Sequence, residues 1–397
     1  MCIAHMVRTN APQNNTIKVL KLTKLFTDFT NSEKTAGLVL VACTIISLML
    51  ANCSFSEQYI KFWHFTIFNK PLEFWINDGL MTLFFLLVGL EIERELYVGE
   101  LSNLKKSLLP IFAAVGGMLV PALIYFYFNK GLVSQSGFGI PMATDIAFSL
   151  AVLSLLGSRV PISLKIFLTA LAIIDDLGAI IVIALFYSTN FLALYFLLAL
   201  LVFVIMLLLR KYKVQQLWLY LLLGAVMWFF IYRSGIHPTI TGILLAFAIP
   251  FGQGQQSSVS FKLQHRLHLP VAFFILPVFA LVNTAIHIQP ELLSNLSSAN
   301  SYGIMLGLIV GKPVGIFLFC MLGIALGLCA LPEDVNKKHL FLTGLLAGIG
   351  FTMSMFITLL AFTDLQIINV SKIAVIISSV IAGLLGYVGL RLTLKNK

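Results

Sequence analysis

Five ionisable residues stand inside long apolar stretches of this 397-residue sequence, where a charged side chain is costly. They are Asp78, Asp145, Asp175, Asp176 and Lys312. At membrane depth such residues usually face a cavity or one another, and they commonly take part in moving ions or protons. We therefore expect the chemistry of the molecule to lie with these four carboxylates and this amine.

The two adjacent aspartates, Asp175 and Asp176, lie near the centre of the stretch LTALAIIDDLGAIIVIAL. Neighbouring residues on a helix project about 100° apart, so both carboxylates can border one cavity. An apolar surrounding disfavours the charged form of a carboxyl group, and a second carboxylate disfavours it further. Such a pair can hold protons, or a small hard cation once the protons leave. A protonated aspartate that only joins two helices is the structural alternative.

Asp145 follows Gly137, Gly139 and Pro141 in the segment SGFGIPMATDIAF. Proline lacks a backbone donor and disfavours helix just before it, so we expect a break in this helix. Freed backbone groups at membrane depth are tolerated only beside protein or a wet cavity. Asp145, with Thr144 as a hydroxyl ligand, could form half of an ion site, or could merely accept from free N–H groups.

The buried amine, Lys312, lies in GLIVGKPVGIFLF, about ten residues into its apolar segment. A buried lysine needs an acidic partner or it loses its proton. Asp175 and Asp145 are the natural partners, and the sequence does not choose between them. A side chain that snorkels to the membrane surface is the alternative.

A second helix break is expected in LTGLLAGIGFTMSMF, where Gly344, Gly348 and Gly350 precede Thr352 and Ser354. Close packing through small residues is the alternative reason for these glycines. Two interrupted segments, one in each half of a transporter, indicate a binding site at the interface of two structural repeats.

The amino-acid composition indicates whether the chain is a soluble protein or a membrane protein. Hydrophobic residues make up 59% of the chain, charged residues 11%, and the mean hydropathy is +0.98, whereas soluble proteins carry about 25% charged residues. A soluble enzyme, a nucleic-acid binder and a disordered protein are excluded. Long apolar blocks, rather than weak alternation, predict an all-α polytopic membrane protein.

Twelve stretches approach the roughly 20 apolar residues that a membrane span needs, although the eighth is short. They cover residues 36–53, 72–90, 108–128, 138–157, 162–187, 190–209, 215–231, 236–251, 270–288, 302–330, 340–362 and 367–390. An even number of spans places both termini on one side. Of the 26 basic residues, 20 then fall on that side and five on the other, which predicts cytoplasmic termini.

The domain organisation follows from these spans. We expect a cytoplasmic tail over residues 1–35, one transmembrane domain over 36–390 and a short cytoplasmic end over 391–397. Residues 18–30 of the tail could lie on the membrane as an amphipathic helix or be disordered.

Residues 59–68, turned by 69–71, could form a short periplasmic hairpin or an interfacial belt of aromatic residues. Spans three to five and ten to twelve, residues 108–187 and 302–390, would be inverted repeats.

Five blocks of the sequence closely resemble the NhaA family of Na⁺/H⁺ antiporters. They are INDGLMTLFFLLVGLEIEREL, PMATDIAFSLAVL, LTALAIIDDLGAI, GKPVGI and GLLAGIGFTMSMFI. The resemblance runs from about residue 32 to the C-terminus and implies the NhaA fold, with broken helices in spans four and eleven. It also implies electrogenic exchange of Na⁺ or Li⁺ for more than one proton in a bacterial inner membrane, without a cofactor. Family members often form homodimers through a periplasmic hairpin.

The resemblance further implies roles for individual residues. Asp175 and Asp176 carry the cation and the protons, with Thr144 as a possible further ligand. Asp145 and Lys312 compensate the facing ends of the two broken helices, and Lys312 can also pair with Asp175.

A second group of residues matches the ion path and the pH response of the family. Asp78 lines the path. The predicted pH-responsive residues are Glu91, Arg94, Glu95, His237, His265 and His268. Two positions depart from the family pattern, because Glu93 stands where a basic residue is usual and Gln264 where an acidic one is usual. The charge of the cluster at the cytoplasmic entrance therefore differs from that of the family, which bears on the pH at which transport begins.

Three other functions compete with antiport at this stage. A proton-coupled carrier of an organic solute would need a larger cavity with polar and aromatic groups. An intramembrane aspartyl protease would also use paired carboxylates, such as Asp145 with Asp175. A passive channel would conduct ions without proton counterflow.

Overall fold

The computed structural model describes residues 34–188, 191–252, 255 and 257–394. The tail predicted over residues 1–35, including its amphipathic segment, therefore lies almost wholly outside the described residues, as do residues 395–397 at the other end. Side chains are also left aside at residue 100 and at residues 104–106.

Helices dominate the described residues. After a first helix, Lys34–Leu50, the elements in the N-terminal half are α2 (Ser56–Trp63), β1 (Thr66–Ile67), β2 (Lys70–Pro71), α3 (Leu72–Phe74), η1 (Trp75–Leu80), α4 (Met81–Tyr97), η2 (Glu100–Ser102), α5 (Leu104–Asn129), η3 (Val133–Met142), α6 (Ile146–Ser154), η4 (Gly157–Arg159) and α7 (Ile162–Phe186). The C-terminal half contains α8 (Ala193–Lys211), α9 (Leu217–Ser234), α10 (Ile240–Ala248), α11 (Val259–Pro270), η6 (Val271–Ile275), α12 (Leu276–Asn283), α13 (Pro290–Ser294), η7 (Asn295–Ser297), α14 (Ala299–Leu306), η8 (Gly307–Gly311), α15 (Lys312–Ala325), α16 (Lys337–Ala347), α17 (Phe351–Ala361) and α18 (Leu365–Thr393).

Every predicted span coincides with a helix or with a pair of helices. Eight helices in the described part of the chain are long and apolar enough to cross a bilayer, and ten if each of two bent pairs counts as one span. The remaining two predicted spans correspond to shorter helices, Lys34–Leu50 and the nine-residue α10. The all-helical, multi-pass fold class is confirmed.

Both predicted helix breaks are present. The 3₁₀ helix η3 meets α6 at a bend of 42°, and α16 meets α17 at a bend of 49°. Pro141 is the ninth of the ten residues of η3, and its missing N–H removes a backbone bond that would help to continue the helix. Gly348 lies at the end of α16, and a Cβ there would come within 2.4 Å of the Leu308 carbonyl oxygen. The glycine therefore serves both the break and close packing.

Three spans contain a π-helical turn that the sequence did not predict. These turns are η1, η6 and η8. Asp78 lies within η1, and Lys312 directly follows η8. π-Helical turns are rare and often occur at functional sites.

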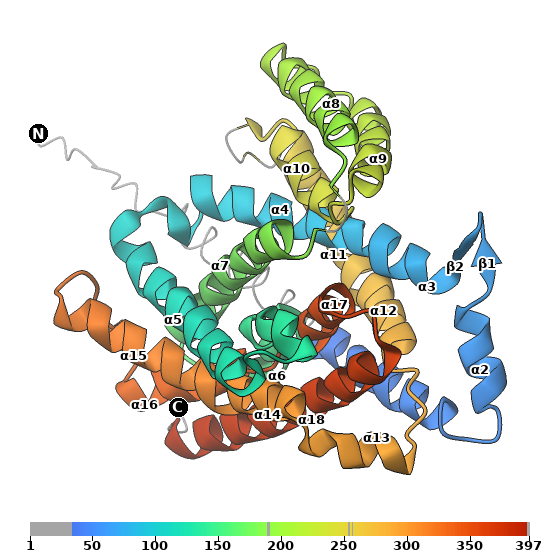
Figure 1. The fold of residues 1–397 in the computed structure, drawn as a ribbon. Helices are drawn as coiled ribbons and strands as arrows, with labels where there is room; N and C mark the ends of the chain where they lie inside the picture. The colour runs from blue at the N-terminus through green and yellow to red at the C-terminus, as the bar shows by residue number, and fades with distance from the viewer. Residues whose placement is uncertain (1–33, 189–190, 253–254, 256, 395–397) are drawn as a thin grey trace, which may run out of the picture.

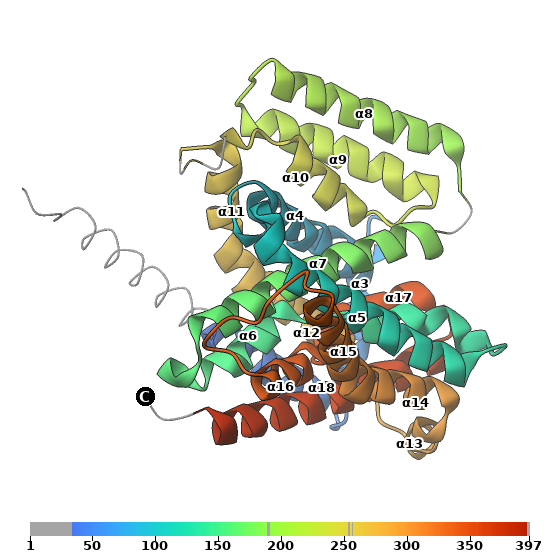
Figure 2. The same cartoon turned by 90° about the vertical axis from the view of Figure 1, so that its left-hand side faces the viewer.

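The described helices form two main hydrophobic clusters and a small third one, in which Val88 and Ile92 of α4 meet Ile173 of α7. The larger main cluster is built mainly from α5, α7, α12 and α14 to α18, and the smaller main cluster joins α4 to α8, α9 and α10. In Figures 1 and 2, α8, α9 and α10 stand together at one side of the molecule, with α4 and α7 between them and the larger group. Helix α4, which contributes to both main clusters, thus lies where the two groups meet.

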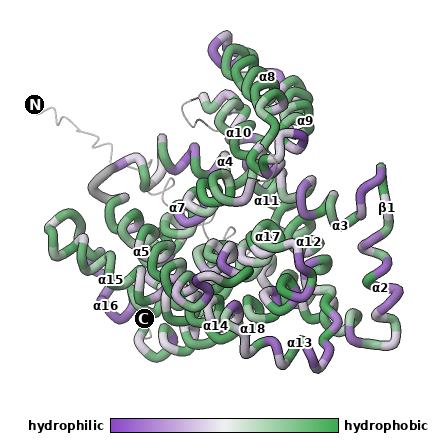
Figure 3. The backbone as a smooth tube through the Cα atoms, in the orientation of Figure 1, coloured by the Kyte–Doolittle hydropathy of each residue, from purple (hydrophilic) through white to green (hydrophobic). Residues whose placement is uncertain are grey.

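Apolar side chains cover the outer faces of the helices. Figure 3 shows hydrophobic residues along most helices and hydrophilic residues at connections such as the region of α2 and β1. Large apolar side chains on α8 and α18, including Leu194, Leu201, Leu384 and Leu392, are exposed. Such a surface is suited to lipid rather than to water.

The predicted hairpin exists but is shorter than expected. Residues 59–63 belong to helix α2, and only Thr66–Ile67 and Lys70–Pro71 pair as antiparallel strands. Phe68 and Asn69 between them have φ of 50° and 60°, the left-handed conformation of a tight hairpin turn.

Candidate functional site

The central pair of the site joins α7 to the start of α15. Lys312 Nζ lies 3.0 Å from Asp175 Oδ2, and both side chains are completely buried. The Thr144 hydroxyl, from the break between η3 and α6, donates to the same oxygen at 2.8 Å. The sequence left Asp175 and Asp145 open as partners of Lys312, and the structure pairs it with Asp175.

The neighbouring carboxyl group of Asp176 is buried on the same helix. Within the described residues, Oδ1 of Asp176 and Oδ1 of Asp175 are buried without a hydrogen-bond partner. Buried oxygens without a donor are costly and call for a physical reason. Each aspartate therefore keeps an oxygen that could accept a proton or a cation.

Asp145 accepts hydrogen bonds from both broken helices. Its Oδ1 accepts from the Phe148 N–H at 2.9 Å, which caps α6. Its Oδ2 accepts from the Thr352 N–H at 3.0 Å and from the Thr352 hydroxyl at 2.5 Å, at the start of α17. Helix N-termini carry partial positive charge, so one buried carboxylate faces two such ends.

Lys312 contacts the C-terminal end of a helix, whereas Asp145 contacts N-terminal ends. Besides its pairing with Asp175, its Nζ donates to the carbonyl oxygen of Met142, the last residue of η3. A helix C-terminus carries partial negative charge and leaves carbonyl groups without helical donors. The Lys312 ammonium group thus connects α15 both to α7 and to the break between η3 and α6.

The two breaks also bond directly to each other. The Asp145 N–H donates to the Ile349 carbonyl at 2.7 Å, and the Thr144 hydroxyl to the Ala347 carbonyl at 3.0 Å. In return, the Ser354 hydroxyl donates to the Ile140 carbonyl at 2.7 Å. Freed backbone groups in each break therefore find partners in the other, as an apolar interior requires.

Two predicted residues with separate roles lie together. Asp78 Oδ1 is 3.7 Å from His237 Nε2, and both side chains are mostly buried. The His237 ring also meets the ring of Phe356 edge-on, with 5.5 Å between centroids. The sequence predicted that Asp78 lines the ion path and that His237 takes part in the pH response. In the structure these two residues contact each other.

The other predicted pH-responsive residues lie on α4 and α11. The Glu91 carboxyl group of α4 lies beside the Gln264 side chain of α11. The Arg94 guanidinium lies 5.4 Å from the centroid of the Phe261 ring. Glu95, on α4, and His265 and His268, on α11, belong to the same two helices. The structure therefore brings α4 and α11 into contact, but keeps His237 apart from this group, with Asp78.

The sequence did not predict the partner of Glu93. This side chain is fully buried, and its Oε1 lies 3.0 Å from Arg210 Nη2 on α8. Arg210 Nη1 also donates to the Phe247 carbonyl near the end of α10. Arg210 was counted only as a basic residue of a connection, whereas it joins α8 to α4 and α10.

Three further buried polar residues, Asn77, Asn283 and Lys372, were not predicted from the sequence. The Asn283 amide of α12 donates to Asn77 Oδ1 in η1 at 2.8 Å. Lys372 is one of the five basic residues that the span prediction counts on the exterior side, but it lies seven residues after the start of α18 and is buried. Single amides and a lysine near a helix end gave no signal beyond composition.

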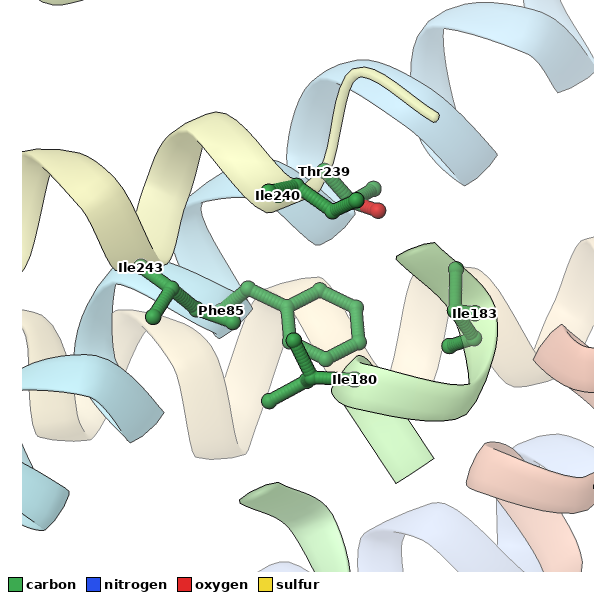
Figure 4. A pocket seen from close by; sticks show the side chains of 6 residues that line it. All are labelled: Phe85, Ile180, Ile183, Thr239, Ile240 and Ile243. Carbon is green, nitrogen blue, oxygen red and sulfur yellow. The ribbon is translucent and has the colours of Figure 1, made fainter. Parts of the chain in front are cut away.

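The hollow drawn in Figure 4 is apolar. Phe85, Ile180, Ile183, Ile240 and Ile243 line it, and Thr239 adds one hydroxyl group. Its lining comes from α4, α7 and the start of α10, where the two helix groups meet. Such a lining offers neither charges for an ion nor polar groups for an organic solute.

Comparison with known proteins shows which family has a similar sequence. The family model described as Na⁺/H⁺ antiporter 1 matches residues 27–390. A protein of Flavobacterium psychrophilum named Na⁺/H⁺ antiporter NhaA is 57% identical over 377 residues, covering 95% of this chain and 98% of its own. Proteins of the same name from Cytophaga hutchinsonii and Vibrio cholerae are 55% and 43% identical, each over 95% of this chain and at least 97% of their own.

Proposed function

This chain belongs to the NhaA family of Na⁺/H⁺ antiporters and is a membrane transporter rather than an enzyme, and we propose that Asp175 and Asp176 are the site of exchange. The observation that carries this proposal is the pair of adjacent buried carboxyl groups, each with one oxygen that lacks a hydrogen-bond partner. Na⁺ and protons are the transported ions, and both bind carboxylate oxygens.

Exchange follows from competition for the same oxygens. Na⁺ needs ionised carboxylates, whereas protons neutralise them, so the site holds one kind of ion or the other. Alternating access then carries Na⁺ from the cytoplasm outward and protons inward. The Thr144 hydroxyl, which already contacts Asp175, serves as a further oxygen ligand of the cation.

More than one proton per Na⁺ requires a second group that releases a proton. Asp176 supplies one proton when Na⁺ binds. Because Na⁺ also engages Asp175, Lys312 loses its counter-ion and releases the second. The site then becomes one charge unit more negative on exchanging two protons for one Na⁺, so the cycle moves net charge. The pairing of Lys312 with Asp175 at 3.0 Å supports this assignment.

Asp145 and Lys312 keep the two broken helices in register. Asp145 faces helix N-termini and Lys312 faces a helix C-terminus, so each compensates the partial charge of those ends. We assign Asp145 to this role and not to ion binding, because both of its oxygens already accept hydrogen bonds.

The residues around Asp78 and on α4 and α11 serve the path and its control. Asp78 lines the path, and its neighbour His237 adjusts access with pH. The pH response arises on the two packed helices, from Glu91, Arg94, Glu95, His265 and His268.

The placement in the membrane completes the proposal. The molecule lies in a bacterial inner membrane with cytoplasmic termini and transports Li⁺ as well as Na⁺. Residues 108–187 and 302–390 form inverted repeats, which the same order of span, broken span and span in both segments supports. Homodimers form through the hairpin, where Phe68 is strongly exposed.

Everted membrane vesicles with a pH-sensitive dye test the site. Addition of Na⁺ or Li⁺, but not K⁺, should collapse the proton gradient, more weakly at acid pH because the aspartates stay protonated. Asp175→Asn and Asp176→Asn should each abolish this response. Asp334→Asn is the matched control, since that exposed aspartate contacts only Ser163 among the hydrogen bonds of the described residues. Full exchange in the Asp176→Asn variant would end the assignment.

The rival functions predict other outcomes in the same vesicles. A carrier of organic solutes would respond to solute and not to Na⁺. A channel would pass a voltage-driven current without proton movement. An intramembrane aspartyl protease is excluded because the chain is a transporter. In addition, the Asp145 carboxylate already accepts hydrogen bonds from the N-terminal ends of two helices.

A further inference from the structure

A cavity outside the ion site lies where α18 ends beside the connection from α6 to α7. Its volume is about 170 Å³, and its lining residues are Leu155, Leu156, Arg159, Tyr387 and Arg391. Leu155 and Leu156 follow α6, and Arg159 lies in η4. Tyr387 and Arg391 are four residues apart on α18, a spacing that puts them on one face of a helix.

The cavity brings together two guanidinium groups that have no acidic partner among the residues that the structure describes. Neither Arg159 nor Arg391 takes part in an ion pair between residues that the structure describes. Two like charges that face one hollow repel each other, and an anion between them removes that repulsion. The planar guanidinium group is also the side chain best suited to phosphate, which it can bind through two hydrogen bonds.

The surroundings of the cavity are apolar and open to the outside. Leu155 is 44% exposed at its edge, and on α18 the exposed fractions of Leu384, Val388 and Leu392 are 60%, 49% and 81%. These side chains form an exposed apolar strip on the helix that also carries Tyr387 and Arg391. A ligand that matches both features has an anionic head and an apolar body.

We propose that this cavity binds the phosphate of an anionic phospholipid, whose acyl chains lie along the exposed face of α18. Arg159 and Arg391 hold the phosphate, and the Tyr387 hydroxyl donates a third hydrogen bond. The bound lipid joins the end of α18 to the connection that precedes α7, the helix of Asp175 and Asp176. This assignment is a binding site separate from antiport and does not depend on which residues carry Na⁺.

Lipid binding to the purified full-length chain in mild detergent tests the proposal. Native mass spectrometry should show phosphatidylglycerol retained over phosphatidylcholine at equal concentration. Hydrogen bonds to charged groups contribute about 1.5–3 kcal/mol, so losing both arginines should weaken phosphatidylglycerol binding at least tenfold. The test variant is Arg159→Gln with Arg391→Gln. The matched control is Arg266→Gln, which removes an exposed arginine of α11.

Each outcome decides the matter. Selective loss in the double variant, with Arg266→Gln unchanged, supports the site. Equal retention of both lipids, or equal loss in the control, overturns it, since the binding would then be general electrostatics. Inorganic phosphate that displaces the lipid at equal concentration would indicate a free-anion site instead of a lipid site. If the double variant does not fold, Arg391→Lys replaces it, and unchanged selectivity there refutes bidentate recognition by Arg391.

Discussion

Lys312 and Asp175 form a fully buried ion pair, 3.0 Å from Nζ to Oδ2, between the start of α15 and the middle of α7. Lys312 simultaneously donates to the end of η3 through the Met142 carbonyl. One ammonium group therefore links the proposed ion-carrying aspartate to the first broken helix, and its removal affects both binding and fold.

Removing this lysine should destabilise the protein strongly. Lys312→Ala leaves Asp175 buried without its counter-charge, and breaking a buried pair from one side costs about 3–5 kcal/mol. Thermal unfolding in detergent should show a clear drop for Lys312→Ala and little change for Lys338→Ala at an exposed site. Adding Asp175→Ala to Lys312→Ala should restore part of the loss. A Lys312→Ala protein as stable as the parent would contradict the pairing.

The Thr144 hydroxyl should matter for Na⁺ affinity rather than for the shape of the site. Thr144→Val removes the donor to Asp175 and to the Ala347 carbonyl but keeps the volume. A lost hydrogen bond of this kind costs about 1 kcal/mol, or roughly fivefold in the apparent KM for Na⁺. Thr144→Ser retains the hydroxyl and should behave as the parent. Equal KM values for the valine and serine variants would rule out Thr144 as a ligand.

Asp145 should act on stability and leave competition between Na⁺ and protons unchanged. Asp145→Asn keeps one acceptor oxygen for two helix ends and places an amide where the Thr352 N–H or the Phe148 N–H now donates. We expect the free energy of unfolding to fall by about 1–3 kcal/mol. In the fraction of the variant that folds, the apparent KM for Na⁺ should depend on pH as it does in the parent protein. A shifted pH dependence would assign Asp145 to ion binding instead.

The pair of the fully buried Glu93 carboxylate with the partly exposed Arg210 should show strong coupling. Arg210→Gln leaves the Glu93 carboxylate buried and unpaired and also frees the Phe247 carbonyl, so a loss of about 3–5 kcal/mol is expected. Combining it with Glu93→Gln should recover more than half. Lys211→Gln, at the next and exposed position, is the control. Additive effects of the two single changes would show that the pair does not hold α4 to α8.

The sequence predicted the features that depend on local chain properties. Spans follow from apolar length, and the two breaks follow from Pro141 and from Gly348 with Gly350, because proline and glycine act on their own backbone. The π-helical turns before Lys312 and around Asp78 have no such local signal. The hairpin is shorter than predicted because residues 59–63 lie in helix α2, against the strand preference of their aromatic and β-branched side chains.

Contacts between distant helices could not be read in this way. The choice of Asp175 over Asp145 for Lys312, the pairing of Glu93 with Arg210 and the contact of Asp78 with His237 all depend on how separate spans pack. Charge balance narrowed the partner of Lys312 to two residues. It gave no partner for Glu93, because Arg210 was placed in a connection outside the membrane.

Proton release on Na⁺ binding tests the central claim most directly. Isothermal titration calorimetry of the purified protein, repeated in buffers of different ionisation enthalpy, counts the protons released per Na⁺ bound. The account predicts more than one proton per Na⁺ in the parent protein and no Na⁺ binding in Asp176→Asn. Na⁺ binding without proton release, or unchanged binding in Asp176→Asn, would contradict competition for the two aspartates.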